Sequence, residues 1–223
     1  MSAHSLLPSL LLTHLHLFRQ LNLSGNCLCG VREDDNGRQH GKYASEGIKA
    51  IADALRVNGA LTRVDIRRNN ISGDGAEQLA AAVLGNLKIE MFNEIPIKEM
   101  RADSFTELDL KGKGFGVVGG MVVAGLIPVM GGLTSINLSE NQLCGITAPL
   151  WRGQHGTYTA EGITAIADAL RVNGGLTSIN LSENQLCGIW TDIDGGQHGS
   201  YTAEGITAIA DALRVNGALT KIE

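Results

Sequence analysis

The sequence predicts an α/β fold built from repeated units, each made of one strand, one turn and one helix. Two observations predict it. Residues 133–175 and 176–218 are identical at 35 of 43 positions, so the chain repeats itself at a fixed period. Within each copy, a short segment of alternating apolar residues precedes a longer segment with helical periodicity. We therefore expect equivalent residues of successive copies to occupy equivalent places.

The first part of each unit is expected to be a strand and a turn. Apolar residues stand at the first, fourth and sixth places and asparagine at the ninth, as in Leu133, Ile136, Leu138 and Asn141. The polar Asn137 between the fourth and sixth places faces outward, as in a half-buried strand. The amide at the ninth place can bond backbone groups that the turn leaves open. Stacked units should then form an internal ladder of asparagines.

The second part of each unit is expected to be a helix. In the segment TAEGITAIADALRVNG, which begins at Thr159, the residues Ile163, Ile166, Ala167 and Leu170 are spaced i, i+3, i+4 and i+7. This spacing places them on one apolar stripe of a helix. Each helix can therefore cover its own strand and the neighbouring units.

The same frame fits five units and the start of a sixth. We number them from one to six by their first residues, which are Phe18, Leu61, Phe105, Leu133, Leu176 and Leu219.

Three departures stand near the middle of the array. Lys113 replaces the ninth-place asparagine of unit three, and the glycine-rich segment 119–132, which contains Pro128, replaces its helix. Residues 87–104 form an irregular short unit. We expect a distorted step at this point.

The repeated LxxLxLxxN pattern, with a helix in the same phase each time, resembles the leucine-rich repeat family and its ribonuclease-inhibitor subtype. The resemblance covers residues 18–223. It implies a right-handed solenoid, a horseshoe-shaped arc with a parallel sheet on the concave face and helices on the convex face. Residues 1–17 would form an N-terminal segment or cap.

Three units are longer than the family's spacing because they carry an insert between the turn and the helix. The inserts are residues 30–44, 145–159 and 188–202. Each should lie on the rim of the sheet, just past the strand ends, and loops on a rigid scaffold are where binding residues concentrate.

The tips of the inserts are expected to recognise a partner. Between the two nearly identical units, six of the eight differences are consecutive and fall at these tips. The alternative is that the tips touch nothing and therefore vary freely. Aromatic and charged residues can anchor a partner protein. The candidate anchors are Trp151, Arg152, Trp190, Asp192 and Asp194.

The concave face is set by the third, fifth and seventh places of each strand segment. In units four and five these places hold serine and asparagine, whereas in units two and three they are charged. The charged residues are Arg63, Asp65, Arg67, Glu107, Asp109 and Lys111. Complementary charges fix the relative position of two proteins and speed their association, so we expect this half to bind a protein. Solvated surface is the alternative interpretation for the carboxylates.

Cysteine, histidine and tyrosine recur at fixed places in the three long units. The recurring sets are Cys29, Cys144 and Cys187, then His40, His155 and His198, and then Tyr43, Tyr158 and Tyr201. A metal site needs about four ligands in one shell, whereas stacking would spread these residues along a row. We expect no metal and no cofactor. The cysteines should pack as small apolar groups, and histidine with tyrosine should hold each insert against its neighbour.

Charge and hydropathy exclude several classes of partner. The net charge is −5 and the sequence contains no run of like charge. Both observations argue against binding to nucleic acid or to an anionic membrane surface. The longest apolar run, Phe115 to Met130, is broken by glycines and by Pro128 and is shorter than the roughly 18 residues of a membrane span. Phosphate-binding loops and nucleophile elbows are absent from the sequence, so we expect no enzyme.

The sequence thus favours a non-catalytic scaffold that binds a protein partner through the concave face and the rim inserts, in a reducing compartment such as the cytoplasm. One alternative is a GTPase activator resembling the Ran-activating leucine-rich repeat proteins, although no residue here matches that family's site. Another is the sensor segment of a larger intracellular receptor. The strand expected at 219–223 has no helix after it, so we expect the natural array to continue past residue 223, with weak self-association through this end as a by-product.

Overall fold

The computed structural model describes residues 19–33, 39–146, 156–191 and 195–223. The predicted strand is present in every unit, and the strands pair in parallel in two sheets, β1-β4-β5 and β6-β7-β8-β11. Their bounds are β1 (Gln20–Asn22), β4 (Arg63–Asp65), β5 (Met91–Phe92), β6 (Glu107–Asp109), β7 (Ser135–Asn137), β8 (Ser178–Asn180) and β11 (Lys221–Ile222). The chain is therefore a mixed α/β structure with parallel sheets.

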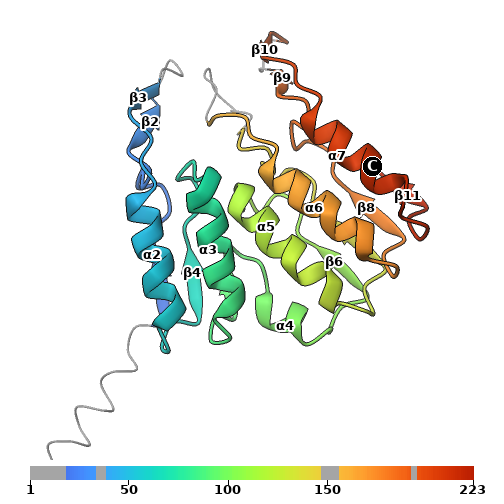
Figure 1. Cartoon of the computed structure of the whole chain (residues 1–223), viewed down its shortest axis with the longest axis horizontal. Helices are drawn as coiled ribbons and strands as arrows, with labels where there is room; N and C mark the ends of the chain where they lie inside the picture. The colour runs from blue at the N-terminus through green and yellow to red at the C-terminus, as the bar shows by residue number, and fades with distance from the viewer. Residues whose placement is uncertain (1–18, 34–38, 147–155, 192–194) are drawn as a thin grey trace, which may run out of the picture.

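The described residues include six α-helices, and all except the short α4 lie side by side in chain order in front of the strands, with α4 at the lower end of the row in Figure 1. They are α2 (Glu46–Val57), α3 (Gly73–Gly85), α4 (Ile97–Arg101), α5 (Gly116–Leu126), α6 (Glu161–Val172) and α7 (Glu204–Leu213). Contacts join α2 to α3, α3 to α5, α5 to α6 and α6 to α7. The apolar core lies between this row of helices and the strands.

The sheet register follows the sequence repeat. In β7 and β8, Ser135 pairs with Ser178 and Ile136 with Ile179, which are residues at equivalent places in units four and five. Both isoleucines are buried. The repeat period of the sequence thus sets which residues pair in the sheet.

The predicted ladder of asparagines is present and links one unit to the next. The buried Asn184 accepts hydrogen bonds at Oδ1 from the backbone N–H groups of Asn141 (3.0 Å) and Leu143 (3.2 Å) in the preceding unit. Its Nδ2 donates to the carbonyl of Leu138 in that unit (2.9 Å) and to that of Leu181 in its own (3.0 Å). Asn69 and Asn141 are buried in the same arrangement.

A second set of asparagines follows the helices, and the repeat pattern alone did not indicate a role for it. The members described in this arrangement are Asn58, Asn86, Asn173 and Asn216. Asn216 Nδ2 donates to the carbonyls of Leu170 (2.6 Å) and Asn173 (3.0 Å) in the preceding unit. The last carbonyls of a helix lack intrahelical partners, so this amide satisfies them while joining two units.

The predicted distorted step is confirmed at the short unit. Residues 87–104 contain only the two-residue strand β5 and the five-residue helix α4, and β5 does not pair with β6. Asn93 takes the ladder position here and accepts a hydrogen bond from the backbone N–H of Ile66 at 2.9 Å. A lysine cannot accept hydrogen bonds, so Lys113 cannot repeat this bridge in unit three.

The expectation that the glycine-rich segment 119–132 replaces a helix is wrong. Residues Gly116–Leu126 form α5, and Pro128 falls in the short 3₁₀ helix Ile127–Val129 that follows it. Most of α5 is buried and its neighbours α3 and α6 approach closely, so tertiary packing overrides the low helix propensity of glycine. A Cβ on Gly162 of α6 would collide with the carbonyl oxygen of Leu143 and lie 3.2 Å from the Cα of Val117 in α5.

Gly162→Ala should therefore destabilise the protein by about 2 kcal/mol, because overpacking forces backbone apart. Gly174→Ala is the matched control, since a Cβ there meets no atom within 4 Å. Urea unfolding of the two variants measures the difference. Equal free energies of unfolding would show that the close approach of α5 and α6 is absent.

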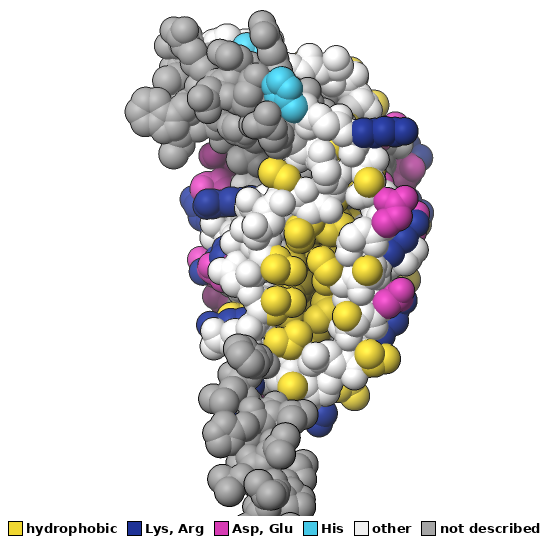
Figure 2. All heavy atoms as spheres, turned by 90° about the vertical axis from the view of Figure 1, so that its left-hand side faces the viewer, with side chains coloured by type: hydrophobic (Ala, Val, Ile, Leu, Met, Phe, Trp, Pro, Cys, Tyr) yellow, Lys and Arg dark blue, Asp and Glu magenta, His cyan; other side chains and the backbone are white. Residues whose placement is uncertain are grey.

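The face of the first unit is apolar. Leu21 and Leu23 are half-buried, whereas the equivalent Val64 and Ile66 of the next unit are buried. Figure 2 shows hydrophobic side chains gathered on this face. The predicted N-terminal segment or cap, residues 1–17, lies outside the described residues.

Candidate functional site

The charged residues predicted on the concave face fall into two groups in the structure. Arg63 and Asp65 belong to β4, while Glu107 and Asp109 belong to β6, and β5 of the short unit stands between the two strands in the chain. The β4 and β6 strands are in different sheets. The predicted patch is therefore divided at the distorted step.

The first group is built around Arg67. Its guanidinium contacts both oxygens of Asp65, with Nη2 2.7 Å from Oδ2 and Nε 3.0 Å from Oδ1. Nη1 lies 2.7 Å from Glu94 Oε1 and donates to the carbonyl of Lys113 at 2.9 Å. A forked contact of this kind fixes the arginine, so Arg67 joins unit two to the short unit and to unit three. Glu94 was missed because the short unit lacks the repeat pattern.

The second group is more open. Lys111 Nζ lies 2.9 Å from Glu140 Oε1, and the side chains of both residues are exposed. An exposed ion pair contributes little to stability because water screens it. These two charges are therefore accessible to a partner.

The residues at the fifth place of each unit also have a structural role that was not predicted. Asp65 Oδ1 accepts the backbone N–H of Arg67 (3.1 Å) and Asp109 Oδ1 that of Lys111 (3.0 Å), and asparagine does the same in units four and five. Each side chain closes a local turn at the end of its strand. The sequence feature that could have indicated this role is the aspartate or asparagine at the fifth place of each of these units.

The ion pairs shift the pKa values of their members. Hydrogen bonding from Arg67 holds the pKa of the Asp65 carboxyl below its usual range, and the same bond raises the pKa of Arg67. Hydrogen bonding to Glu140 raises the pKa of Lys111. The three groups are therefore charged at neutral pH.

Two predicted residues are exposed and have no hydrogen-bond or ion-pair partner for their side chains within the described ranges. They are Arg63 on β4 and Glu107 on β6, both at the third place of their strands. Their charges are free to pair with a partner.

The first and third inserts form antiparallel hairpins. The first pairs β2 (Val31–Glu33) with β3 (Gln39–Gly41), and the third pairs β9 (Ile189–Thr191) with β10 (Gln197–Gly199). Trp190 is 5% exposed and stacks on His198 with ring centroids 4.4 Å apart, so it presents little surface. The other candidate anchors, Trp151, Arg152, Asp192 and Asp194, lie outside the described residues.

The expected role of the recurring tyrosines is confirmed for two of them. Tyr43 Oη donates to the carbonyl of Ser72 at 2.6 Å and Tyr158 Oη to that of Leu186 at 3.0 Å, and each contact holds an insert against the next unit. Tyr201, in the last long unit, is exposed.

The recurring cysteines pack as expected in the first two long units. Cys29 and Cys144 are buried, and Cys187 is half-buried. Burial raises the pKa of the Cys144 thiol to about 12, so this sulfur is a neutral packing group at neutral pH. In the described ranges, no three side chains of His, Cys, Asp or Glu gather closely enough to hold a metal ion.

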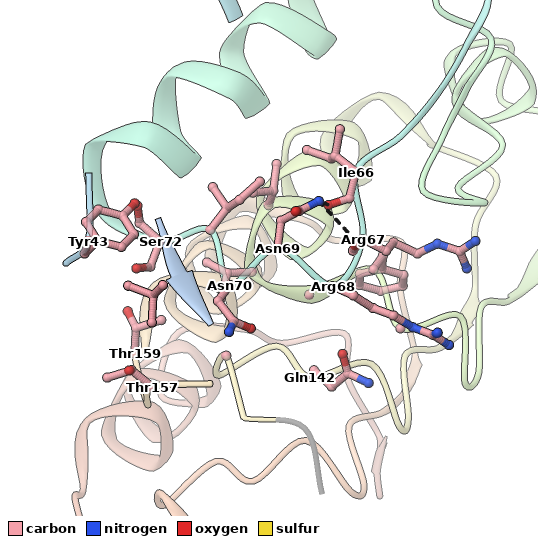
Figure 3. Close-up of a pocket in the computed structure, with 18 of the residues that line it drawn as sticks. Tyr43, Ile66, Arg67, Arg68, Asn69, Asn70, Ser72, Gln142, Thr157 and Thr159 are labelled. Carbon is pink, nitrogen blue, oxygen red and sulfur yellow. Dashed lines mark hydrogen bonds between the residues drawn. The ribbon is translucent and has the colours of Figure 1, made fainter. Parts of the chain in front are cut away.

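A cavity of about 360 Å³ lies at the rim, between the first and second inserts (Figure 3). Units two and three carry no insert, so their turns form its floor. Among the described residues that line it, Arg67 is the one predicted site residue. The spacing of the units in the sequence could have indicated this cavity, because two units without inserts lie between units that carry them.

The comparisons with known proteins leave the family open. No family model matches the chain, and a search of the curated proteins gives no match. Among the solved structures, the tropomodulin C-terminal domain of Caenorhabditis elegans is 10% identical with a TM-score of 0.31, over 90% of this chain and 85% of that chain. So weak a likeness establishes neither family nor partner. No helix in the described ranges is both long enough and apolar enough to span a membrane.

Asp65→Asn tests the Arg67 group. The folded pKa of Asp65 is below the unfolded value of about 3.9, so its carboxylate stabilises the fold above that pH and the contribution is lost as the pH falls through the folded pKa. The variant should lose about 1 kcal/mol at pH 7 and show a shallower loss of stability in acid. Urea unfolding between pH 7 and pH 3 measures both.

Asp109→Asn is the control for this experiment, because it keeps the turn acceptor and Asp109 has no ion pair in the described structure. If both variants lose the same stability at pH 7, the Arg67 pair contributes nothing specific.

Proposed function

We propose that the chain is a non-catalytic protein-interaction scaffold of the leucine-rich repeat type, ribonuclease-inhibitor subtype, with its strands on the concave face of a right-handed arc. Three features support this proposal. The strands are parallel and in register, each full unit from one to five has one helix, and a buried asparagine bridges successive units. The buried free thiols of Cys29 and Cys144 suit a reducing compartment such as the cytoplasm.

The observation that carries the proposal is the pair of exposed, unpaired charges at equivalent places of two strands. Arg63 and Glu107 stand on backbone that parallel pairing holds in place. A partner that meets these charges does not have to order the backbone that carries them, so less free energy is lost on binding than with a mobile loop. Lys111 with Glu140 extends this surface along unit four. The partner would therefore bear charges complementary to this pattern.

Affinity capture from the source-cell lysate with the intact chain tests the proposal. Arg63→Glu should weaken capture of a specific partner at least about tenfold, because it reverses one of the free charges. Arg67 is a poor choice for this purpose, since its substitution would also break the contacts with Asp65 and Glu94.

Ser178→Glu is the matched control. It introduces the same charge at the same third place of a strand, but on β8, where the face carries serine and asparagine. Capture should then be unchanged. Loss of capture with Ser178→Glu and none with Arg63→Glu would place the binding surface on the other half of the sheet and refute the assignment.

A further inference from the structure

We propose that the rim cavity binds an acidic peptide segment of a partner protein, with a carboxylate at Arg68 and a neighbouring apolar side chain on the cavity floor. The proposal rests on the proposed function in one respect, that the ligand is part of a protein.

The cavity has the size and position for a pair of side chains. Its volume of about 360 Å³ lies at the lower end of the range for ligand sites, roughly 300–1,000 Å³. The first insert contributes Lys42 and Tyr43 to one wall, and the second contributes Thr157 and Thr159 to the other. Arg67 lines the cavity and also stands at the edge of the charged sheet face, so one partner segment can reach both.

The walls are held in place without a ligand. Tyr43 Oη bonds the carbonyl of Ser72, which ties the first insert to the floor. The carboxylate of Glu161, at the start of α6, accepts the backbone N–H of Gly73 at the start of α3 (2.8 and 3.0 Å). These contacts join the two sides of the cavity across unit three. A cavity formed in advance loses little free energy to ordering when a ligand enters.

The charge of the lining favours an anion. Among the described residues that line the cavity, three are cationic (Lys42, Arg67 and Arg68) and none is aspartate or glutamate, although the chain as a whole has a net charge of −5. Asp65 and Glu94 pair with Arg67, and Glu94 also lies 3.7 Å from Lys113 Nζ, so these two carboxylates are matched by two cations. Lys42 and Arg68 are exposed, and their side chains have no ion pair or hydrogen bond to any other described residue. An arginine in this state is well suited to a forked contact with a carboxylate.

The remaining lining residues suit a peptide better than a free ion. Asn70 and Gln142, whose side-chain amides have no hydrogen bond in the described structure, lie around the same opening as Arg68 (Figure 3). Amides can donate to and accept from a peptide backbone. Below them the floor is apolar, with Ile71 and Phe115 among its residues. A bare anion would leave that apolar surface unused.

The test is a titration of the ¹⁵N-labelled full chain with two pools of capped heptapeptides. In the acidic pool the central residue is Glu or Asp and its neighbours are Leu, Ile, Val or Phe. In the control pool the centre is Gln or Asn. The backbone amides of Asn70, Gly114 and Gly116, all in the cavity lining, should shift with the acidic pool and at least about tenfold less with the control pool.

Arg68→Gln should reduce the response to the acidic pool about tenfold, and Lys42→Gln should reduce it by a smaller factor. Arg214→Gln is the control, because Arg214 pairs with Asp211 on α7, outside the cavity, and should not change the titration. The dispersion of each spectrum reports whether the variant is folded.

Three results would overturn the proposal: no shift at the cavity amides with either pool, equal shifts with both pools, or shifts of the same size with sodium phosphate alone at the same concentration. Phosphate-induced shifts would assign the site to a free anion. The titration uses no natural partner, so its failure leaves the capture experiment on the sheet face unaffected, and failure of that capture leaves the titration unaffected.

Discussion

The side-chain amide of the ninth-place asparagine holds successive units in one relative position. Asn184 accepts from two backbone N–H groups of the preceding unit and donates to one of its carbonyls. Because the amide is buried, any slip of one unit past another would leave its polar atoms without partners, at a cost of about 1–3 kcal/mol for each group. Strand register, helix contacts and the tyrosine contacts of the inserts all depend on this alignment.

The alignment explains how the candidate surfaces arise. Equivalent residues of paired units fall on one face, so Glu107 at the third place of its strand stands beside Ser135 and Ser178 of the later strands, while Arg63 stands beside Gln20 in the other sheet. Inserts likewise emerge on one rim, and the units that lack them leave the cavity between the first and second inserts. Where the ladder changes at Asn93, the sheet divides, and Glu94 with Arg67 supplies the contacts across the division.

Features that depend on the repeat itself could be predicted from the sequence, and features that depend on packing between units could not. The strands, the asparagine ladder, the distorted step and the contacts of Tyr43 and Tyr158 follow from residues at fixed places. The helix α5 was missed because its glycines lower local helix propensity, while Gly120 lets it pack closely against α6 and Gly125 against Leu84 of α3. The burial of Trp190 against His198 depends on the hairpin of the third insert, which the repeat pattern does not predict. The cavity depends on the absence of an insert from units two and three.

Native-state hydrogen exchange tests the central claim most directly, because it measures separately each backbone amide that donates to a ladder asparagine. The amides of Asn141 and Leu143, which donate to Asn184, and those of Asn26 and Leu28, which donate to Asn69, should exchange only through opening events that separate units. Their free energies of exchange should approach the free energy of global unfolding measured in urea. Exchange of these four amides as fast as that of the hairpin β9–β10 would show that the asparagines do not hold the units together.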